Sequence, residues 1–215
     1  MLITYHGHSE FYLEGAHGFT LLTDPFDAHV GYPMGAYRAD AVTVTHGHSD
    51  HNFTAKATGT PAIIDSAGEW YPAPEVKITA LPSVHDDAGG AKRGGNLIMK
   101  IETEGLTLVH LGDQGAPLTG EQLAALGEVD VLMIPVGGYF TIDAQTAFDT
   151  VRALRPRVTI PMHFKTQANA GWPIADEKEF LRLMGQPDLV PLPLLRVTRG
   201  DLSEQPPLAL LRPQE

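Results

Sequence analysis

THGHSDH, at residues 45–51, brings three histidines and one aspartate together within six positions. The apolar, β-branched run AVTVT at residues 41–45 leads directly into it and is typical of a buried strand. A lone histidine is more often a surface or core residue than a metal ligand. Four metal-binding side chains at this density, on a loop that leaves a strand, favour a metal site over either of those ordinary roles.

The spacing within this loop suits two ions. His46 and His48 are two positions apart, so their rings can lie on the same side of the extended chain and bind one ion through imidazole nitrogens. Asp50 and His51 can face a second ion if the chain turns after Ser49. We therefore expect this short loop to contribute ligands to two metal sites.

Three other apolar runs also end at a potential metal ligand. VKITALPSV leads to His85, LVHLG leads to Asp113, and VTIPM leads to His163. In layered α/β proteins, residues just beyond strand ends project into a shared crevice. We therefore expect all four segments to deliver their side chains to one point.

Elsewhere the chain consists of short apolar runs separated by Gly and Pro, with few helices. We predict strands at residues 2–5, 11–13, 19–23, 41–45, 62–64, 76–81, 97–102, 106–111, 131–136, 158–161 and 194–198. Helices are predicted from Thr119 in TGEQLAALG, from Asp143 in DAQTAFDTVRALRP, and from Asp176 to Met184. A strand-rich first half and an alternating second half indicate an α/β fold with sheet layers flanked by helices.

The composition limits the class of protein. A length of 215 residues, 43% hydrophobic and 19% charged, fits one globular domain spanning residues 1–215. The absence of cysteine excludes disulfides, thiolate metal ligands and cysteine nucleophiles. A net charge of −11 makes nucleic acid a poor partner, although a local basic patch or a bound dication can reverse the field near one site.

The sequence also indicates where the protein works. Its N-terminus has no basic segment followed by an apolar one, and no stretch approaches the ~20 apolar residues of a membrane span. We therefore expect a cytoplasmic protein with a small-molecule substrate and no membrane partner. A homo-oligomer is left open.

These motifs resemble those of the metallo-β-lactamase superfamily, whose signature is HxHxDH after a strand. THGHSDH matches this signature in full, and LLTDP at residues 21–25 is similar to the family's early strand and turn. The opening GHS at residues 7–9 is similar to a subgroup that includes ascorbate-6-phosphate lactonase and small metal-dependent hydrolases. The resemblance covers nearly the whole chain and implies a four-layer αβ/βα sandwich.

The resemblance also implies how the ligands are shared between two divalent ions. The ligands would be His46, His48 and His85 for the first ion, Asp50, His51 and His163 for the second, and Asp113 as a bridge between them. Asp50 and Asp113 are the catalytic candidates. An aspartate at the bridging position is the phosphodiesterase and lactonase arrangement, which disfavours lactamase activity. His and carboxylate ligands suit several metals, of which we expect zinc first and manganese second.

Two such ions would bind one water between them and lower its pKa toward neutrality, supplying hydroxide for attack on a carbonyl or phosphoryl centre. We therefore expect a hydrolase acting on a small ester, lactone or phosphodiester, with an anionic substrate as one option. Two alternatives stay open. One is an iron-dependent redox enzyme on the same scaffold, and the other is a non-catalytic, metal-stabilised binding protein.

Five further residues are candidates for supporting the ligands or contacting the substrate: His8, Asp24, Asn96, His110 and Lys165. Metal-bound imidazoles usually donate their other N–H to a carboxylate or carbonyl, and Asp24 is the candidate for that role. Its alternative role is that of a turn residue before Pro25. His8 and His110 each adjoin a motif and could line the cavity, transfer a proton or simply pack.

The Gly-rich stretch DDAGGAKRGGN, residues 86–96, is expected to border the metals as a flexible loop. Asn96 lies at its end and could meet an anionic substrate, as could Lys165, two residues beyond the last histidine. Lys92 and Arg93 fit a solvated loop slightly better than a substrate contact.

Overall fold

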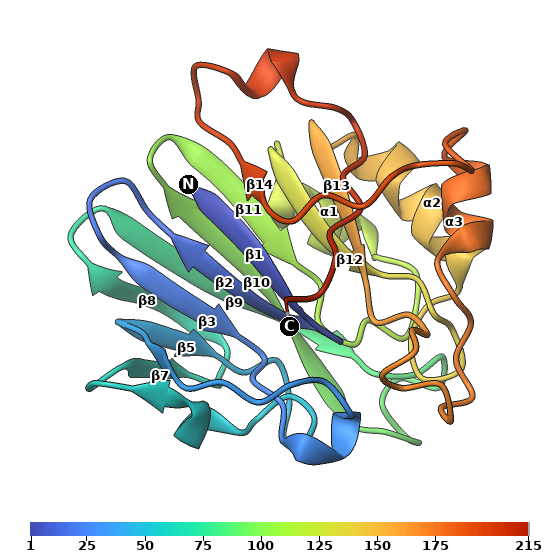
Figure 1. Cartoon of the computed structure of the whole chain (residues 1–215), viewed down its shortest axis with the longest axis horizontal. Coiled ribbons are helices and arrows are strands. Elements are labelled where there is room, and N and C mark those ends of the chain that lie inside the picture. The colour runs from blue at the N-terminus through green and yellow to red at the C-terminus, as the bar shows by residue number, and fades with distance from the viewer. Residues whose placement is uncertain (215) are drawn as a thin grey trace.

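Two six-stranded sheets pack face to face in the computed structural model, which describes residues 1–214 (Figure 1). The first sheet has the order β14-β1-β2-β3-β5-β7, with β1 (Leu2–Gly7), β2 (Glu10–Glu14), β3 (Thr20–Thr23), β5 (Ala41–Thr43), β7 (Ala62–Ile64) and β14 (Leu195–Arg196). The second has the order β13-β12-β11-β10-β9-β8, with β8 (Gly68–Ala73), β9 (Val76–Val84), β10 (Gly95–Thr103), β11 (Leu106–His110), β12 (Val131–Pro135) and β13 (Val158–Met162).

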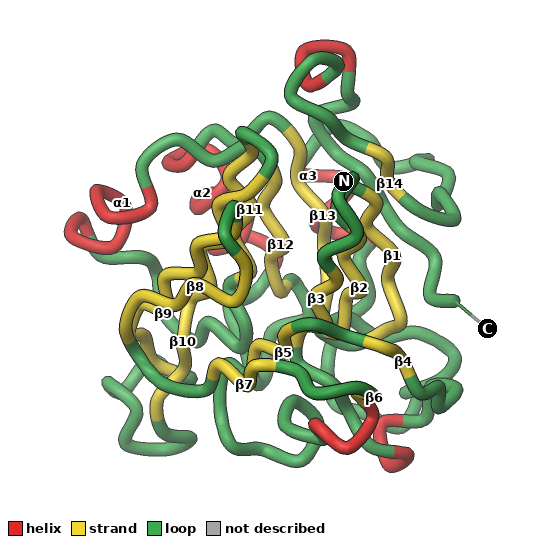
Figure 2. Tube along the Cα trace, turned by 90° about the vertical axis from the view of Figure 1, so that its left-hand side faces the viewer, coloured by secondary structure: helices red, strands yellow, loops and turns green. Residues whose placement is uncertain are grey.

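The three α-helices are α1 (Gly120–Leu126), α2 (Ala144–Leu154) and α3 (Lys178–Leu183). Figure 2 shows α1 and α2 on the outer side of the second sheet, and α3 packs against α2. The mixed α/β fold with two sheets is therefore confirmed. The two outer layers are unequal, because the short connections of the first sheet form 3-10 turns at Ala28–Val30 and Thr54–Lys56 and a ribbon of β4 (Tyr37–Arg38) and β6 (Ala57–Thr58).

Local capping explains where two of the helices begin. Thr119 accepts a hydrogen bond from the backbone N–H of Gln122, and the Gln122 side chain accepts one from the backbone N–H of Thr119. Asp143 caps α2 by accepting from the backbone N–H of Thr146. Both predicted helix starts are therefore confirmed.

The hydrophobic core lies between the sheets and under the helices. Along β9, Val76, Ile78 and Ala80 are buried and alternate with partly exposed residues, as a strand with one covered face requires. Every residue of β12 and β13 is buried, because these parallel strands have the other sheet on one face and helices on the other. This packing fixes the strands whose ends carry polar residues.

Six strands run in matched directions and end at polar side chains. In the first sheet β1 is antiparallel to β2, β2 to β3, and β3 is parallel to β5, so β1, β3 and β5 share a direction. The same reasoning places β9, β11 and β13 in one direction in the second sheet. Within three residues of their ends come, in chain order, His8, Asp24, His46, His85, Asp113 and His163.

None of the helices formed by residues 1–214 has the length and apolar character needed to cross a membrane.

Candidate metal centre

The six strand ends meet and bring together the side chains that the sequence predicted as ligands. Three sets of these side chains place one ligand atom each within 4.8 Å of one another: His46, His48 and His85; His8, His51 and His163; and His46, His51 and Asp113. The sets share members, so they form one continuous cluster. Nitrogen and carboxylate oxygen atoms of this kind could hold metal ions.

The first set has its ring orientation fixed from outside the cluster. The rings of His46 and His85 lie 4.7 Å apart between centroids, and the ring of His48 lies 4.6 and 5.1 Å from them. His85 donates from Nδ1 to the backbone carbonyl of Phe140 at 3.1 Å, which leaves its Nε2 lone pair facing the cluster. His48 is exposed, so the cluster is open to solvent on this side.

His46 is oriented by its neighbour in sequence. The Thr45 hydroxyl donates to Asp24 at 2.6 Å and lies 3.1 Å from Nδ1 of His46. With its hydrogen engaged by Asp24, this hydroxyl can only accept from His46, so the proton of the ring is on Nδ1. The lone pair on Nε2, a buried atom with no hydrogen-bond partner among the described residues, is then available to a metal.

Asp113 lies between the first set and the second set. Its buried Oδ2 is 3.2 Å from Nε2 of His85, 3.3 Å from Nε2 of His51 and 3.3 Å from Nε2 of His163. The backbone N–H of Asp113 donates to the Asn96 side chain at 3.0 Å, which holds the loop after β11 in place. A carboxylate in this position can contact ions on both sides of it.

Asp50 and His51 turn toward the second set. Oδ2 of Asp50 lies 3.6 Å from Nε2 of His51 and 3.1 Å from Nε2 of His8. The ring of His163 lies 4.3 Å from that of His8, and both of its nitrogens are buried without a partner among the described residues. The loop at residues 45–51 therefore contributes to all three sets.

Asp24 joins this loop to the end of β3. Its fully buried carboxylate accepts from the backbone N–H of Thr45 at 2.8 Å, from the Thr45 hydroxyl, and from Nδ1 of His51 at 2.9 Å. The last of these bonds leaves Nε2 of His51 as the lone-pair donor inside the cluster. Besides its place in the turn before Pro25, Asp24 thus binds two residues of the loop at 45–51.

Burial and neighbouring charge set the protonation states. Burial, followed by the charge of His51, lowers the pKa of His46 to about 3, and burial followed by His163 lowers the pKa of His8 to about 4. Burial opposes ionisation of Asp113, but His163 and His51 outweigh it and hold the pKa of that carboxyl well below its usual range. His51 has a raised pKa, because Asp113 and Asp24 outweigh the effect of burial.

The pattern of unpartnered atoms fits bound cations. Among the described residues, the buried side-chain atoms of the cluster that make no hydrogen bond are Nδ1 of His8, Nε2 of His46, Oδ1 of Asp113 and both nitrogens of His163. Buried polar atoms normally find a partner, because each one left without costs free energy. Lone pairs of nitrogen and carboxylate oxygen concentrated at one point are what zinc, manganese or iron would satisfy.

Two other predicted residues, Asn96 and His110, have their polar groups bound to the backbone. Asn96 is buried and donates to the Leu111 carbonyl at 2.9 Å while its oxygen supports the Asp113 backbone. His110 donates to the Ser9 carbonyl at 2.8 Å and accepts from the Gly112 N–H at 3.1 Å, so the backbone uses both of its nitrogens. These two residues brace the site.

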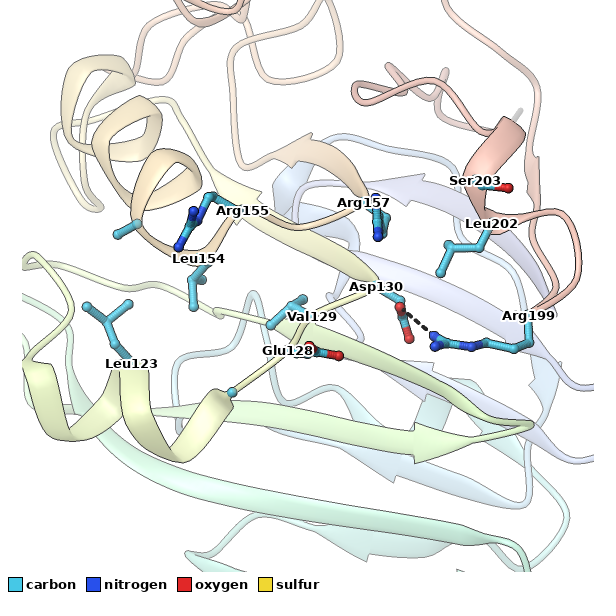
Figure 3. A pocket seen from close by; sticks show the side chains of 12 residues that line it. Leu123, Glu128, Val129, Asp130, Leu154, Arg155, Arg157, Arg199, Leu202 and Ser203 are labelled. Carbon is cyan, nitrogen blue, oxygen red and sulfur yellow. Dashed lines mark hydrogen bonds and ion pairs between the residues drawn. The ribbon is translucent and has the colours of Figure 1, made fainter.

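Lys165 lies away from the cluster. It lines a hollow of about 490 Å³ together with Asp176, Pro191 and Leu211, and no residue of the cluster lines it. Another hollow, of about 550 Å³, is lined by Arg155, Arg157 and an Arg199 that pairs with Asp130 at 3.0 Å (Figure 3). It lies at the N-terminal ends of β12 and β13, whereas the cluster lies at the C-terminal end of β13.

Sequence reasoning missed some contacts. The acceptor for His85 is the main-chain carbonyl of Phe140, to which no side-chain pattern points. Trp172 packs edge-on against His8 at 5.2 Å between ring centroids, from a segment predicted as neither strand nor helix. The flanking loop begins at Asp86, whose carboxylate accepts from the backbone N–H groups of four residues: Ala88, Gly90, Lys92 and Arg93.

Known proteins are similar to this chain in both sequence and fold. The profile of the beta-lactamase superfamily domain matches residues 2–163. A UPF0173 metal-dependent hydrolase of Pyrococcus furiosus is 32% identical, with 86% of this chain and 92% of that protein aligned. Another UPF0173 metal-dependent hydrolase, from Pyrococcus abyssi, is 31% identical over 83% of this chain and 90% of its own length.

Solved structures also superpose on this chain. The crystal structure of a Thermotoga maritima protein described as a candidate zinc-dependent hydrolase of the metallo-β-lactamase superfamily superposes with a TM-score of 0.78, at 32% identity, covering 98% of this chain and 97% of that one. A metallo hydrolase of Ignicoccus hospitalis, at 23% identity and a TM-score of 0.68, shares the fold over 100% of this chain and 96% of its own. The likeness to ascorbate-6-phosphate lactonase stays a prediction.

The chain therefore belongs to the metallo-β-lactamase superfamily and, within it, to the UPF0173 metal-dependent hydrolases.

Proposed function

We propose that the protein is a hydrolase with a two-ion centre. The proposed ligands are His46, His48 and His85 for one ion, Asp50, His51 and His163 for the other, and Asp113 between them. The observation that carries this assignment is the position of one Asp113 oxygen within 3.3 Å of His85 from the first group of ligands and of His51 and His163 from the second. Zinc is the first candidate and manganese the second.

When bound, a pair of divalent ions would lower the pKa of a water molecule and polarise the oxygen of the bond to be cleaved. The chain itself supplies orientation. Asp24 holds His51, and the carbonyl of Phe140 holds His85, so the rings present fixed nitrogens. Asp50 and Asp113 stay ionised at neutral pH because the neighbouring histidines outweigh their burial and lower their pKa values.

The substrate we propose is a small ester, lactone or phosphodiester that carries a negative charge. Exposed His48 and partly buried Asp50 lie on the side of the cluster that solvent reaches. Next to it, the guanidinium carbon of Arg93 lies 5.4 Å from the centre of the Phe140 ring, whose backbone carbonyl accepts from His85. A cation that packs on Phe140, the residue whose carbonyl binds His85, would favour an anionic substrate in a protein whose net charge is −11.

Metal analysis and a substrate panel test this proposal. Protein purified without added metal is analysed by mass spectrometry for metal content, chelated, and reloaded with zinc, manganese or iron. We expect two ions per chain and cleavage within a panel of bis(p-nitrophenyl) phosphate, lactones and esters. Asp113→Asn should lower that activity at least about 100-fold, because one charge between the ions is lost. His17→Asn, at an exposed position, is the matched control.

The same experiment separates the alternatives. Two bound ions without turnover across the panel would favour a metal-stabilised binding protein. Coloured, iron-containing protein without hydrolysis would favour redox chemistry. Full activity after exhaustive chelation would rule out the two-ion proposal itself.

A further inference from the structure

We propose that His8 is an additional ligand of the second ion, alongside the histidines and aspartates named above. This inference rests on the two-ion centre. His8 follows β1, far in sequence from the loop at residues 45–51, and is fully buried. Its Nε2 lies 3.1 Å from Nε2 of His51 and 3.1 Å from Oδ2 of Asp50.

The backbone holds His8 in an unusual conformation that aims its ring at this point. Its φ is +54°, in the left-handed region that residues other than glycine seldom adopt. Its carbonyl accepts from the Tyr5 hydroxyl at 2.9 Å and from the backbone N–H of His163 at 2.8 Å. Strained backbone of this kind persists where the surrounding structure fixes it, often at functional sites.

The glycine before His8 is closely packed. Gly7 has a φ of +109°, and a Cβ there would lie 2.5 Å from the ring of Tyr32. That ring is held by a hydrogen bond between its hydroxyl and Thr166 at 2.8 Å. The backbone of the turn after β1 is therefore held in place, and the ring of His8 itself packs against Trp172 at 5.2 Å between ring centroids.

The chemistry at the tip of the ring favours a cation. Because His51 donates from Nδ1 to Asp24, Nε2 is the nitrogen that faces His8, and in the neutral ring that a metal binds it carries the lone pair. Asp50 presents a carboxylate oxygen to the same atom of His8. A single proton on that atom can be donated well to only one of these acceptors at a time, whereas a divalent cation among them can accept all three electron pairs.

His163 adds a further donor beside this group. Its ring lies 4.3 Å from that of His8, and neither of its nitrogens has a hydrogen-bond partner in the described part of the chain. Nitrogens of His8, His51 and His163 lie within 4.8 Å of one another, closely enough for one ion. The second ion would thus take three imidazoles, while the first also takes three.

Two length-matched substitutions separate ligation from hydrogen bonding. Glutamate can bind a metal but, when ionised, cannot donate a hydrogen bond to Asp50. Glutamine can donate to Asp50 but is a weak ligand for zinc. His8→Glu and His8→Gln meet similar backbone strain at this position, so their difference reports on chemistry. His6→Gln, a buried histidine on the same strand whose Nδ1 donates to Glu10, is the control.

Zinc binding is measured by calorimetric titration of metal-free protein and by metal content after desalting. We expect His8→Gln to lower the affinity for the second zinc ion by at least about 100-fold. This is more than the loss of an outer supporting residue normally lowers metal affinity. His8→Glu and His6→Gln should keep two ions, with the second within about tenfold of its wild-type affinity. Circular dichroism and melting of the metal-free forms check folding.

Other results would overturn the assignment of His8 as a ligand. If His8→Gln keeps two zinc ions at wild-type affinity, His8 is not a ligand. If both His8 variants lose the second ion, a crystal of zinc-loaded wild type decides: a bond from His8 to the metal supports the proposal, and a hydrogen bond to Asp50 alone overturns it. Wild-type protein that binds no second zinc ion would instead refute the two-ion centre on which the proposal rests.

Discussion

At the scale of single residues, the orientation of the proposed metal ligands depends on side chains that are not ligands themselves. Asp24 fixes Thr45 and His51 at once, and Thr45 in turn fixes the proton of His46. One buried carboxylate therefore sets the lone pairs of two histidines in different sets. Loss of an outer contact of this kind commonly lowers metal affinity 10- to 100-fold, and we expect a loss of that size at Asp24.

Asp24→Asn should lower the affinity for zinc by about 10- to 100-fold and the free energy of unfolding by roughly 2 kcal/mol, since an amide accepts fewer of the three hydrogen bonds and brings a donor of its own. Zinc titration and urea unfolding measure the two effects. Asp149→Asn, on the solvent side of α2, is the control. Unchanged zinc affinity in Asp24→Asn would mean that His51 is oriented by other means.

Residue types and spacing were sufficient to predict that seven side chains would meet, because each follows an apolar strand. The roles of Asn96 and His110 could not be predicted, since their partners are backbone groups of distant segments. The acceptor of His85 is likewise a carbonyl, which every residue carries. In these cases the role of a side chain depends on which backbone groups lie beside it in the fold, and residue type alone does not predict that.

At the scale of elements, the site depends on how closely neighbouring loops approach. The backbone N–H of Gly115 donates to the Val84 carbonyl at 2.8 Å, directly before His85. A Cβ at Gly115 would lie 2.2 Å from the carbonyl carbon of His85 and from the backbone nitrogen of Asp86. Only glycine permits this contact between the loop after β11 and the end of β9.

Gly115→Ala should reduce stability by at least about 1–3 kcal/mol and weaken metal binding, because backbone atoms must separate where His85 is positioned. Gly120→Ala is the matched control: a Cβ there meets open space at the first turn of α1, so stability should stay level or rise by up to about 1 kcal/mol. Thermal melting with and without zinc measures both. Equal melting temperatures for the two variants would contradict this account.

A buried ion pair ties the hairpin of β1 and β2 to the turn that follows the loop at residues 45–51. Lys56 donates to Glu10 at 2.6 Å, and its ammonium group lies 3.6 Å from the centre of the Phe26 ring. Glu10 also accepts from His6 at 2.7 Å and from the backbone N–H of Phe26 at 3.2 Å. Both charged groups are almost fully buried, so each needs the other.

Lys56→Met should lower the free energy of unfolding by about 3–5 kcal/mol, because it leaves Glu10 charged and buried without its main partner. Adding Glu10→Gln should restore part of that loss, and urea unfolding of the single and double variants measures the coupling. Lys178→Ala removes an exposed ion pair and should cost less than about 1 kcal/mol. A double variant as unstable as the sum of both single ones would contradict the pairing.

Elements with strong apolar runs were predicted well, and the others were not. β8 was missed because GEWYPA begins with glycine and contains proline, and β4 and β6 have only two residues each. The strand predicted at 41–45 ends at Thr43, because Asp24 binds the backbone N–H and hydroxyl of Thr45. Helix α3 is shorter than predicted, since Asp176 accepts from the Lys178 backbone just before it.

At the scale of the whole molecule, a concentration of ionisable groups makes the metal-free protein sensitive to pH. Burial lowers the pKa of His46 to about 3 and that of His8 to about 4, from an ordinary 6.5. A lowered pKa stabilises the folded state fully above pH 6.5, and this stability is lost as the pH falls toward the folded value. His51 acts in the opposite sense, since its pKa is raised.

Metal-free protein should therefore melt at a lower temperature at pH 5 than at pH 7.5. His46 and His8 each contribute roughly 2 kcal/mol between pH 6.5 and 5. Burial also lowers the pKa values of His48 and His110, which act in the same sense, against the one opposing histidine, His51. Calorimetry across this range measures the change, and His17→Asn, at an exposed position, should leave it unaltered. A melting temperature that rises toward pH 5 would show that His51 dominates.

Strand ends from the two sheets are proposed to form one site for two ions. This site can be examined by anomalous scattering at the zinc edge, with crystals of the zinc-loaded protein. We expect two peaks on either side of Asp113, one among His46, His48 and His85 and the other beside His51 and His163. A single peak, or zinc bound only elsewhere on the molecule, would rule out a two-ion site at the strand ends.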